Sequence, residues 1–497
     1  MVNASWRWLS ISSLFICTTC ADGDSAVRPG ATNTERPAST PGGDGMPSPG
    51  NTVATNPTSP TTNGEAMTGD GVPLQTPGSA PPANDGNGST SSAGSGTTTG
   101  DSSAAAPPSA LPGGPLPTVY DVEDTGADCP ASDTFPAFAA LTPVPNLPDP
   151  FLLNSGARIS SRDQWRCRRA EISSQIQYWG SGPKGAPPSN LTATLAGGRL
   201  TVVATRGPAS ITLSSTITTP AGPGPFPLVI GMNAATGSLP AGIFTGVATM
   251  TFTDSQLVAN DFNVTRGAGT YFSMYPDRNT GAMIEWAWGV SRLIDGLYET
   301  ADQNKIDLKH IAVTGCSFQG KMALYAGAFD ERIALVIPEE SGGGGEASWR
   351  FMATQTGTED LEAAQGTAWY AQNLLQFKNA DAPKLPFDMH ELVAMVAPRA
   401  ILAVENTDID RLGSQAGSVS MRAASEVYQA LGIPDRIGFT QAVAAAHCQF
   451  PGSQSPDVQA FVDKFLHGKT TANTSIAKNT YNTDLTQWVT WSTPQLN

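Results

Sequence analysis

A strand, turn and helix pattern at residues 311–326 constrains the fold more than any other segment of the chain. A short apolar run leads into Gly315, and Ser317 then stands between this glycine and Gly320, followed by good helix formers. A serine at such a turn is lifted clear of the sheet, beside the free N–H groups and positive dipole end of a helix. The pattern indicates a nucleophile elbow, although its spacing, Gly-x-Ser-x-x-Gly, is one residue longer than the common form.

A carboxylate follows the next predicted strand. The apolar run at residues 334–337 ends in Pro-Glu-Glu-Ser and four glycines. Since α/β sheets gather their chemistry at the carboxyl edge of parallel strands, Glu340 can lie beside Ser317. Its neighbour Glu339 would point to the other side, because side chains alternate along a strand. We therefore favour Glu340 as the acid that orients the catalytic base.

Two aspartates are alternatives for this acid. Asp408 and Asp410 follow a predicted strand at residues 401–405. That position is the more usual one for the acid of a hydrolase, and an orienting carboxylate can come from the end of either strand. The sequence leaves both aspartates open as replacements for Glu340 or as assistants to it.

The serine needs a base, because a hydroxyl is a poor nucleophile at neutral pH. The chain has four histidines. His310 precedes the elbow strand at the end opposite the serine, His390 starts a predicted helix where we expect a capping role, and His467 follows the last predicted helix. His447 follows the last predicted strand and gives the order Ser, acid, His of α/β hydrolases. His447 is the predicted base.

Several segments resemble the glucuronoyl esterases of carbohydrate esterase family fifteen. The family's elbow reads GCSRxGK and its acid lies in PxESG, where this chain has GCSFQGK and PEESG. Further segments that look like those of the family are WRCRRAEI, GAMIEWAWGVSRLID, LPFDMHELVAMVAPRAIL and HCQFP. The resemblance runs from about Cys129 to the C-terminus. It implies an α/β-hydrolase fold, a three-layer sandwich with a mostly parallel sheet.

Hydrophobic patterning independently predicts an α/β domain, because strand and helix patterns alternate along it. Residues 191–205 and 211–219 alternate apolar and polar side chains, which predicts antiparallel edge strands. Residues 226–231 predict a strand buried on both faces. Residues 281–300 predict the crossover helix before the elbow, and residues 359–377 a further helix.

The resemblance also implies the chemistry. Ser317 would attack a uronoyl carbonyl, His447 would shuttle the proton, and Glu340 would hold the imidazole. The implied substrate is the ester between 4-O-methyl-glucuronic acid of glucuronoxylan and an alcohol of lignin, with no metal or cofactor required. Two competing hypotheses are an esterase for another carbohydrate ester, such as acetylated xylan, and a weakened homologue that only binds carbohydrate.

The predicted substrate site departs from the family's pattern at three positions. The family's arginine beside the nucleophile is Phe318, whose backbone N–H and helix end remain to bind the oxyanion. Lys321 matches the lysine that contacts sugar hydroxyls, but the family's sugar-contacting tryptophan is Arg411. A family glutamate has no direct counterpart, and Glu359 or Glu362 can take its place. We predict substrate binding by Lys321, Glu362 and Arg411.

The N-terminal part of the chain differs in composition from the rest. Residues 1–20 combine a basic residue, a short apolar run and small residues, a secretory signal pattern too short to span a membrane. A lipidated Cys17 or Cys20 is the alternative, although neither lies in a good lipobox. Residues 21–118 are nearly all Gly, Pro, Ser, Thr, Ala, Asn and Asp, which predicts a disordered linker. Residues 119–497 remain for one esterase domain.

The remaining cysteines are consistent with export. If the first two belong to the leader, four are left, and four cysteines allow three pairings. The resemblance implies a bridge between Cys316 and Cys448, which leaves Cys129 to pair with Cys167. The net charge of −15 argues against nucleic acid or an anionic membrane surface as partner. We expect a secreted monomer without a membrane span, held at the cell surface only if the leader is of the lipoprotein type.

Overall fold

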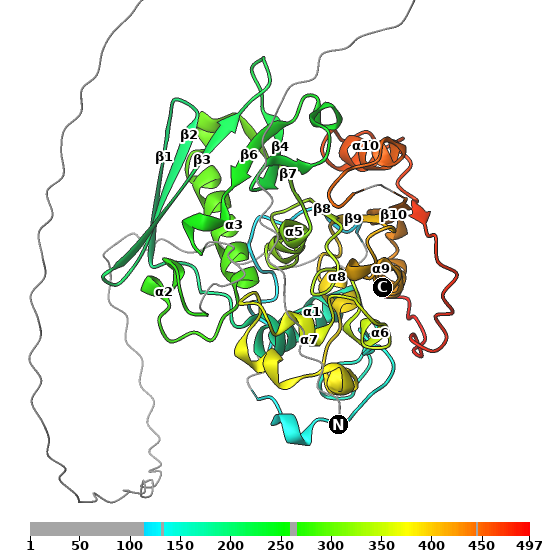
Figure 1. Cartoon of the computed structure of the whole chain (residues 1–497). Helices are drawn as coiled ribbons and strands as arrows, with labels where there is room; N and C mark the ends of the chain where they lie inside the picture. The colour runs from blue at the N-terminus through cyan, green and yellow to red at the C-terminus, as the bar shows by residue number, and fades with distance from the viewer. Residues whose placement is uncertain (1–113, 131–133, 259–265, 444–445) are drawn as a thin grey trace, which may run out of the picture. The chain divides into compact units, whose positions relative to one another are not determined.

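The computed structural model describes residues 114–130, 134–258, 266–443 and 446–497 (Figure 1). The predicted signal peptide and all but the last five residues of the predicted linker lie outside the described residues. Of those five, Leu116 and Pro117 accept hydrogen bonds from the guanidinium of Arg436 at 2.7 and 2.5 Å. Contacts with the α/β domain thus begin slightly before residue 119. No helix in the described part of the chain is both long enough and apolar enough to cross a membrane.

A sheet of ten strands runs through the described residues of the domain, in the order β1-β2-β3-β6-β4-β7-β8-β9-β10-β11. The pairs from β6 to β11 are parallel, and the pairs from β1 to β6 are antiparallel. The prediction of a mostly parallel sheet is confirmed. The strands are β1 (Asn190–Ala196), β2 (Arg199–Arg206), β3 (Ala209–Thr218), β4 (Phe226–Met232), β6 (Ala248–Phe252), β7 (Ile306–Cys316), β8 (Leu335–Glu339), β9 (Ala400–Asn406), β10 (Ile437–Ala442) and β11 (Ala477–Lys478), and the short β5 (Ala235–Ser238) lies outside this order.

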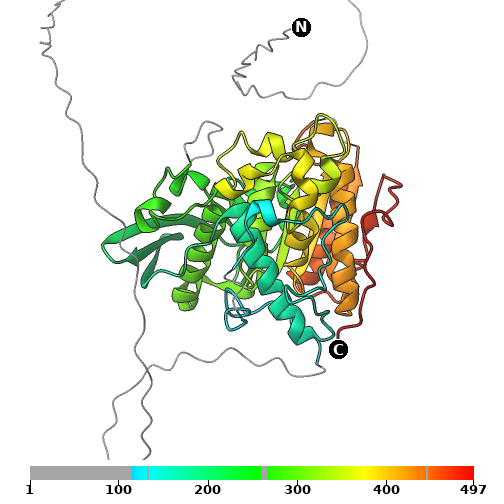
Figure 2. The ribbon, with the colours of Figure 1, turned by 90° about the horizontal axis from the view of Figure 1, so that it is seen from below.

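Helices cover both faces of the sheet, which makes a three-layer sandwich. The helices are α1 (Arg162–Ile176), α2 (Tyr271–Met274), α3 (Ala282–Glu299), α4 (Ala301–Asn304), α5 (Phe318–Ala328), α6 (Trp349–Met352), α7 (Leu361–Ala364), α8 (Met389–Ala394), α9 (Ser414–Ala430) and α10 (Ser455–Phe465). The main core lies between the sheet and the side formed by α1, α3, α5, α8 and α9, whereas α10 packs on the other face. The strands β1, β2 and β3 extend at the opposite end of the domain from α9 and α10 (Figures 1 and 2).

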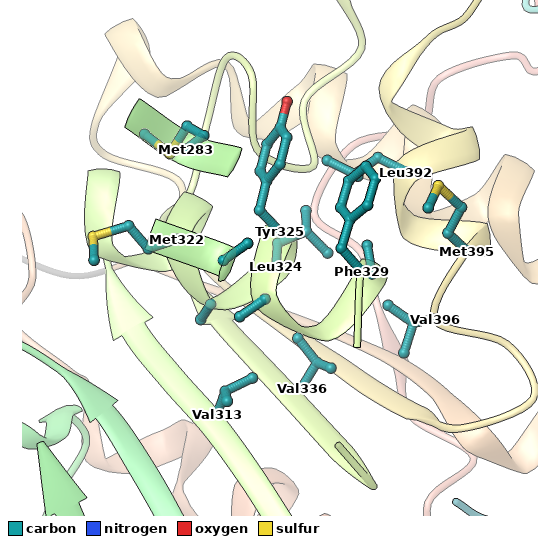
Figure 3. Packing of buried hydrophobic residues seen from close by; sticks show 14 of the residues in the cluster. Met283, Val313, Met322, Leu324, Tyr325, Phe329, Val336, Leu392, Met395 and Val396 are labelled. Atoms are coloured by element: carbon teal, nitrogen blue, oxygen red, sulfur yellow. The ribbon is translucent and has the colours of Figure 1, made fainter. Parts of the chain in front are cut away.

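The alternation of side chains in β8 explains both layers. Val336 faces the core on the side of α5, whereas Leu335 and Ile337 pack with the apolar residues of α10. All three side chains are fully buried, so a strand covered on both faces reads as a continuous apolar run. Figure 3 shows the α5 side of this core, where the labelled side chains are Met283, Val313, Met322, Leu324, Tyr325, Phe329, Val336, Leu392, Met395 and Val396.

The edge of the sheet differs from the prediction. Residues 191–205, predicted as one strand, form two strands, β1 and β2, which pair in an antiparallel hairpin. The turn between them is Gly197 and Gly198, which have φ values of 57° and 80°. These values are open to glycine but costly for other residues. Because the alternating pattern continues on both sides of the turn, the pattern alone concealed the reversal.

The predicted helix at residues 359–377 is also wrong. This segment contains only α7 and a 3-10 turn, Gln372–Gln376. Its backbone instead bonds to other elements: the carbonyls of Ala368 and Trp369 accept from Ala282 and Met283 at the start of α3. A Cβ on Gly281 would lie 2.2 Å from the Trp369 carbonyl oxygen, so only glycine allows this approach. Tertiary contacts therefore replace the hydrogen bonds of the expected helix.

Candidate active site

Ser317 stands at a strained turn between β7 and α5. Its φ of 63° and ψ of −129° are unusual for a residue with a side chain. The backbone N–H of Ser317 donates to the Glu339 carbonyl at 2.9 Å, which ties the turn to the end of β8. Gly315 and Gly320 make the turn possible, because a Cβ on either would lie 2.5 Å from a backbone oxygen, that of Gln319 or Glu339. The local structure is the strand, tight turn and helix that the sequence predicts.

The N-terminus of α5 begins directly after the serine. Phe318 is its first residue, and the first N–H groups of a helix have no partner within the helix. The Phe318 ring packs between two tryptophans: its centroid lies 5.9 Å from that of Trp369, with nearly parallel planes, and 6.2 Å from that of Trp286. The side chain of Phe318 therefore has a packing role, and only the backbone N–H of this residue can contribute to binding an oxyanion.

Glu340 contacts the histidine predicted as the base. Its Oε2 lies 2.6 Å from His447 Nδ1 and also accepts the backbone N–H of Cys448 at 2.9 Å. The Glu340 side chain is buried, whereas that of His447 is 27% exposed. An imidazole that donates from Nδ1 to a carboxylate keeps Nε2 as the proton acceptor. The pair thus has the arrangement of an acid that orients a base.

A disulfide places the serine and histidine loops side by side. Cys316 and Cys448 are bonded, with their Cα atoms 5.8 Å apart, and they are the residues directly before Ser317 and directly after His447. The second disulfide, Cys129–Cys167, attaches the N-terminal segment to α1. Both are the pairings that the resemblance implied.

Four residues around this disulfide are of types that can ligate a metal ion. The side chains of Cys316, Glu340, His447 and Cys448 gather as closely as metal ligands do. However, the two sulfurs are bonded to each other, so neither can supply the thiolate that a metal requires. These four residues do not fit a metal ion.

The other three histidines lie in different surroundings. His310 Nδ1 is 2.8 Å from an oxygen of Asp307, and His467 follows the end of α10. The predicted capping role of His390 is wrong, because Asp388 caps α8. The His390 ring is buried within the first turn and its Nε2 bonds to the Pro148 carbonyl at 2.9 Å. Burial lowers the pKa of His390 to about 4, so this imidazole is neutral at physiological pH.

The other candidate acids do not contact His447 in the described part of the chain. Glu339 points to the opposite side, where it accepts hydrogen bonds from Ser238 and, at 3.3 Å, from Thr314. Burial raises the pKa of Glu339 to about 7. The backbone N–H of Asp408 donates to Asn406 Oδ1, and Asp410 begins a 3-10 turn, Asp410–Leu412. The carboxylate that accepts the hydrogen bond of the imidazole is thus Glu340, at the end of β8.

Near the elbow, Glu359 joins the two cations expected to bind substrate. Its Oε2 lies 3.0 Å from Lys321 Nζ, and its Oε1 pairs with the guanidinium of Arg411. Lys321 is buried and Arg411 is half exposed at the rim. Glu362, predicted at this place, instead lies on the exposed side of α7 and accepts the N–H of Asn379 at 3.4 Å. Of the two glutamates the sequence left open, Glu359 is the one beside Lys321.

A cavity of about 230 Å³ adjoins this ion-pair network. It is lined by Gly343, Glu359, Ala363, Ala364, Gly366, Thr367, Trp369 and Tyr370. Lys321 Nζ lies 5.4 Å from the centroid of the Trp369 ring, which also stacks on Phe318. A flat ring beside charged groups suits a ligand with both apolar and polar surface. Sequence reasoning assigned Trp369 only to a helix, because nothing local shows that it reaches the elbow.

Comparison with known proteins reveals many relatives. Residues 202–432 match the family of fungal glucuronyl esterases. The 4-O-methyl-glucuronoyl methylesterase of Hypocrea jecorina is 39% identical over 75% of this chain and 81% of that protein, and the enzyme of the same name from Thermothelomyces thermophilus is 36% identical over 76% and 93%.

Solved structures agree. The glucuronoyl esterase catalytic domain from Hypocrea jecorina has a TM-score of 0.68 and 38% identity, covering 73% of this chain and all of that one. A serine-to-alanine mutant of the glucuronoyl esterase from Sporotrichum thermophile, in complex with methyl 4-O-methyl-beta-D-glucopyranuronate, has a TM-score of 0.69 and 36% identity over 74% of this chain and all of that one. These neighbours confirm the predicted α/β-hydrolase fold class.

Proposed function

Because the chain belongs to the glucuronoyl esterase family and is a carboxylic ester hydrolase, we propose that Ser317, His447 and Glu340 cleave esters of 4-O-methyl-glucuronic acid. The observation that carries this assignment is the hydrogen bond between Glu340 and His447. The adjoining disulfide holds this pair against the strained turn of Ser317.

The geometry supports acyl transfer through a serine ester. Ser317 Oγ attacks the carbonyl carbon at C6 of the uronic acid while His447 Nε2 takes the serine proton, and Glu340 stabilises the imidazolium. His447 then gives the proton to the departing alcohol. Water, activated by His447, releases the free uronic acid and restores the serine.

The developing oxyanion needs hydrogen-bond donors. We assign this role to the backbone N–H of Phe318 and to the N-terminal end of α5. Preorganised donors bind a forming negative charge more strongly than they bind a neutral carbonyl. The family's arginine is missing here, and the packed ring of Phe318 supplies no donor. Oxyanion binding in this chain therefore depends on the backbone.

The sugar would bind beside Lys321, Glu359 and Trp369. Lys321 and Glu359 offer a donor and an acceptor for the ring hydroxyls, and Trp369 offers a flat apolar surface next to them. Arg411 lies at the exposed rim, bonded to Glu359, where the family has a tryptophan. A polysaccharide chain of glucuronoxylan and a lignin alcohol would then extend from this rim.

Export is part of the proposal. The signal pattern of residues 1–20 and the two disulfides favour an oxidising, extracytoplasmic compartment. Mass spectrometry of the mature N-terminus distinguishes a cleaved leader from a lipidated Cys17 or Cys20. Intact residues 1–20 without lipid would contradict export by this leader.

Kinetics on two esters test the function. We expect efficient hydrolysis of benzyl glucuronate, slow release of acetate from acetylated xylan, and covalent labelling of the wild type but not of Ser317→Ala by a fluorophosphonate. Faster turnover of acetylated xylan would overturn the proposed substrate. Labelling that persists in Ser317→Ala would overturn the assigned nucleophile, and an unlabelled wild type would favour a protein that only binds carbohydrate.

A further inference from the structure

Two carboxyl groups are buried together behind the proposed triad. Glu346 lies in the loop after β8 and Glu405 near the end of β9, and their exposed fractions are 0% and 1%. Gly417 of α9 packs against both: a Cβ there would lie 3.5 Å from Glu346 Oε1 and 3.8 Å from Glu405 Cδ. The two carboxyl groups can hydrogen-bond to each other only when one of them carries a proton, because two carboxylates offer acceptors alone.

The carboxyl oxygens that have no hydrogen-bond donor indicate that this pair shares a proton. Glu346 Oε1 accepts the N–H of Gly342 at 3.2 Å, but Glu346 Oε2 and both oxygens of Glu405 have no donor among the described residues if both groups are ionised. The nearby hydroxyl of Ser414 donates to the Asn406 carbonyl instead. Since an unpaired buried carboxylate is costly, a proton between the two groups is the arrangement that satisfies them.

The surrounding charges decide which residue holds the proton. Glu405 faces two negative groups, Glu346 and Glu340. The backbone N–H of Glu340 donates to the carbonyl of Val404, the residue before Glu405. Burial raises the pKa of Glu346 as well, but the positive charge of Lys321 from α5 opposes that shift. From the C-terminal segment the group near Glu405 is the phenol of Tyr481, which is itself uncharged at neutral pH. Burial and the charge of Glu346 raise the pKa of Glu405 well above its usual range.

We propose that Glu405 is a positioning residue that acts as a protonated acid, donating to Glu346 and thereby fixing the charge that holds Lys321. A row of groups then runs from behind the triad to the rim, and after the neutral Glu405 their charges alternate in sign: anionic Glu346, cationic Lys321, anionic Glu359 and cationic Arg411. The inference rests on the sugar-binding role proposed above for Lys321.

The neutral state of Glu405 also matters for the triad. An ionised Glu405 would place a further negative charge near Glu340 and would break the hydrogen bond to Glu346. The loop between β8 and α6 carries both Glu340 and Glu346, so repulsion within the pair would disturb the triad acid and the negative charge that attracts Lys321 together. We therefore expect activity to decline at alkaline pH when Glu405 loses its proton.

Glutamine and alanine variants separate this role from simple packing. Glu405→Gln keeps a donor for Glu346 and cannot ionise, whereas Glu405→Ala leaves Glu346 without that donor. On methyl 4-O-methylglucuronate at neutral pH we expect Glu405→Gln to keep kcat/KM within about threefold, and Glu405→Ala to lose about tenfold, mainly through KM. The alkaline decline seen in the wild type should be absent in Glu405→Gln.

An infrared difference spectrum gives a readout that does not depend on activity. The wild type should show the carbonyl stretch of a protonated carboxylic acid that Glu405→Gln lacks. Glu285→Gln is the matched control, because Glu285 of α3 is another buried carboxyl group. It accepts a hydrogen bond from the Thr280 hydroxyl at 2.9 Å. It should remove its own band and leave the alkaline decline in place.

Three results would overturn the inference. They are the absence of a Glu405 band from the infrared difference, equal damage to Glu405→Gln and Glu405→Ala, and an unchanged alkaline decline in Glu405→Gln. If Glu405→Ala does not fold, the glutamine variant and the infrared band still decide. If the wild type fails to hydrolyse the ester, the proposed substrate is wrong, while the band still reports separately on the proton.

Discussion

Replacing Glu340 with glutamine tests the proposed acid most directly. The substitution keeps the size of the side chain but removes the charge from an oxygen that accepts both His447 Nδ1, at 2.6 Å, and the N–H of Cys448, at 2.9 Å. The amide can turn its oxygen toward these donors, so we expect the fold to survive. What is lost is the carboxylate that stabilises the imidazolium formed in the transition state.

The expected magnitude follows from two contributions. A hydrogen bond to a charged group contributes about 1.5 to 3 kcal/mol, which corresponds to a loss of roughly tenfold to a hundredfold in rate. Loss of the orienting charge also allows the imidazole to adopt the wrong tautomer, and the same change in a serine protease lowers kcat about 10⁴-fold in total. Since Glu340 is buried, we expect kcat to fall about 10³- to 10⁴-fold with little change in KM.

The controls are the two aspartates that the sequence left open and Glu339, the neighbour of Glu340. Asp408→Asn, Asp410→Asn and Glu339→Gln should each change kcat less than about tenfold, because none contacts the imidazole in the described structure. Initial rates on methyl 4-O-methylglucuronate, with melting temperatures for each variant, provide the comparison. A larger loss in either aspartate variant than in Glu340→Gln would refute the assignment and move the orienting role to the end of β9.

Three further predictions concern stability and the oxyanion site. Replacing Cys316 and Cys448 together with alanine removes a bridge across 132 residues, worth about 4 to 5 kcal/mol in the chain-entropy model, and should lower both the urea midpoint and kcat; an unchanged midpoint would contradict this. Phe318→Arg should lower Tm and kcat, because it loses its ring contacts and adds a cation near buried Lys321, whereas a higher kcat would show that the arginine can enter the oxyanion site. His390 has a folded pKa of about 4, below its unfolded value, so its contribution to stability is present above about pH 6.5 and is lost on acidification toward pH 4, at a cost of about 3 kcal/mol; His390→Gln should flatten this part of the stability curve measured by denaturant titration, and an unaltered slope would count against it.

Features that depend on local pattern can be predicted from the sequence alone. An apolar run, a glycine, a serine, a second glycine and good helix formers specify the turn at Ser317, because strand and helix patterns meet there and glycine permits the crowding. The alternation of strands and helices predicted the parallel sheet, and chain order pointed to His447. The turn and strand signals lie within a few residues of each other, and the order of serine, acid and histidine along the chain can be read without knowing the fold.

Contacts between residues far apart in the chain become visible only in the folded structure. Glu359 rather than Glu362 meets Lys321 and Arg411, because the backbone of Glu359 bonds to the Arg411 carbonyl across 52 residues. The segment at residues 359–377 is not a helix, since its carbonyls accept from the start of α3.

The shared proton of Glu346 and Glu405 has the same origin. Neither glutamate is unusual in the sequence, and each would be an ordinary anion in water. Folding buries both against Gly417 and beside Glu340, where two adjacent charges without solvent are more costly than one retained proton. Periodicity records which face of an element is buried, but not which side chains from different elements meet there, and that meeting sets their charge.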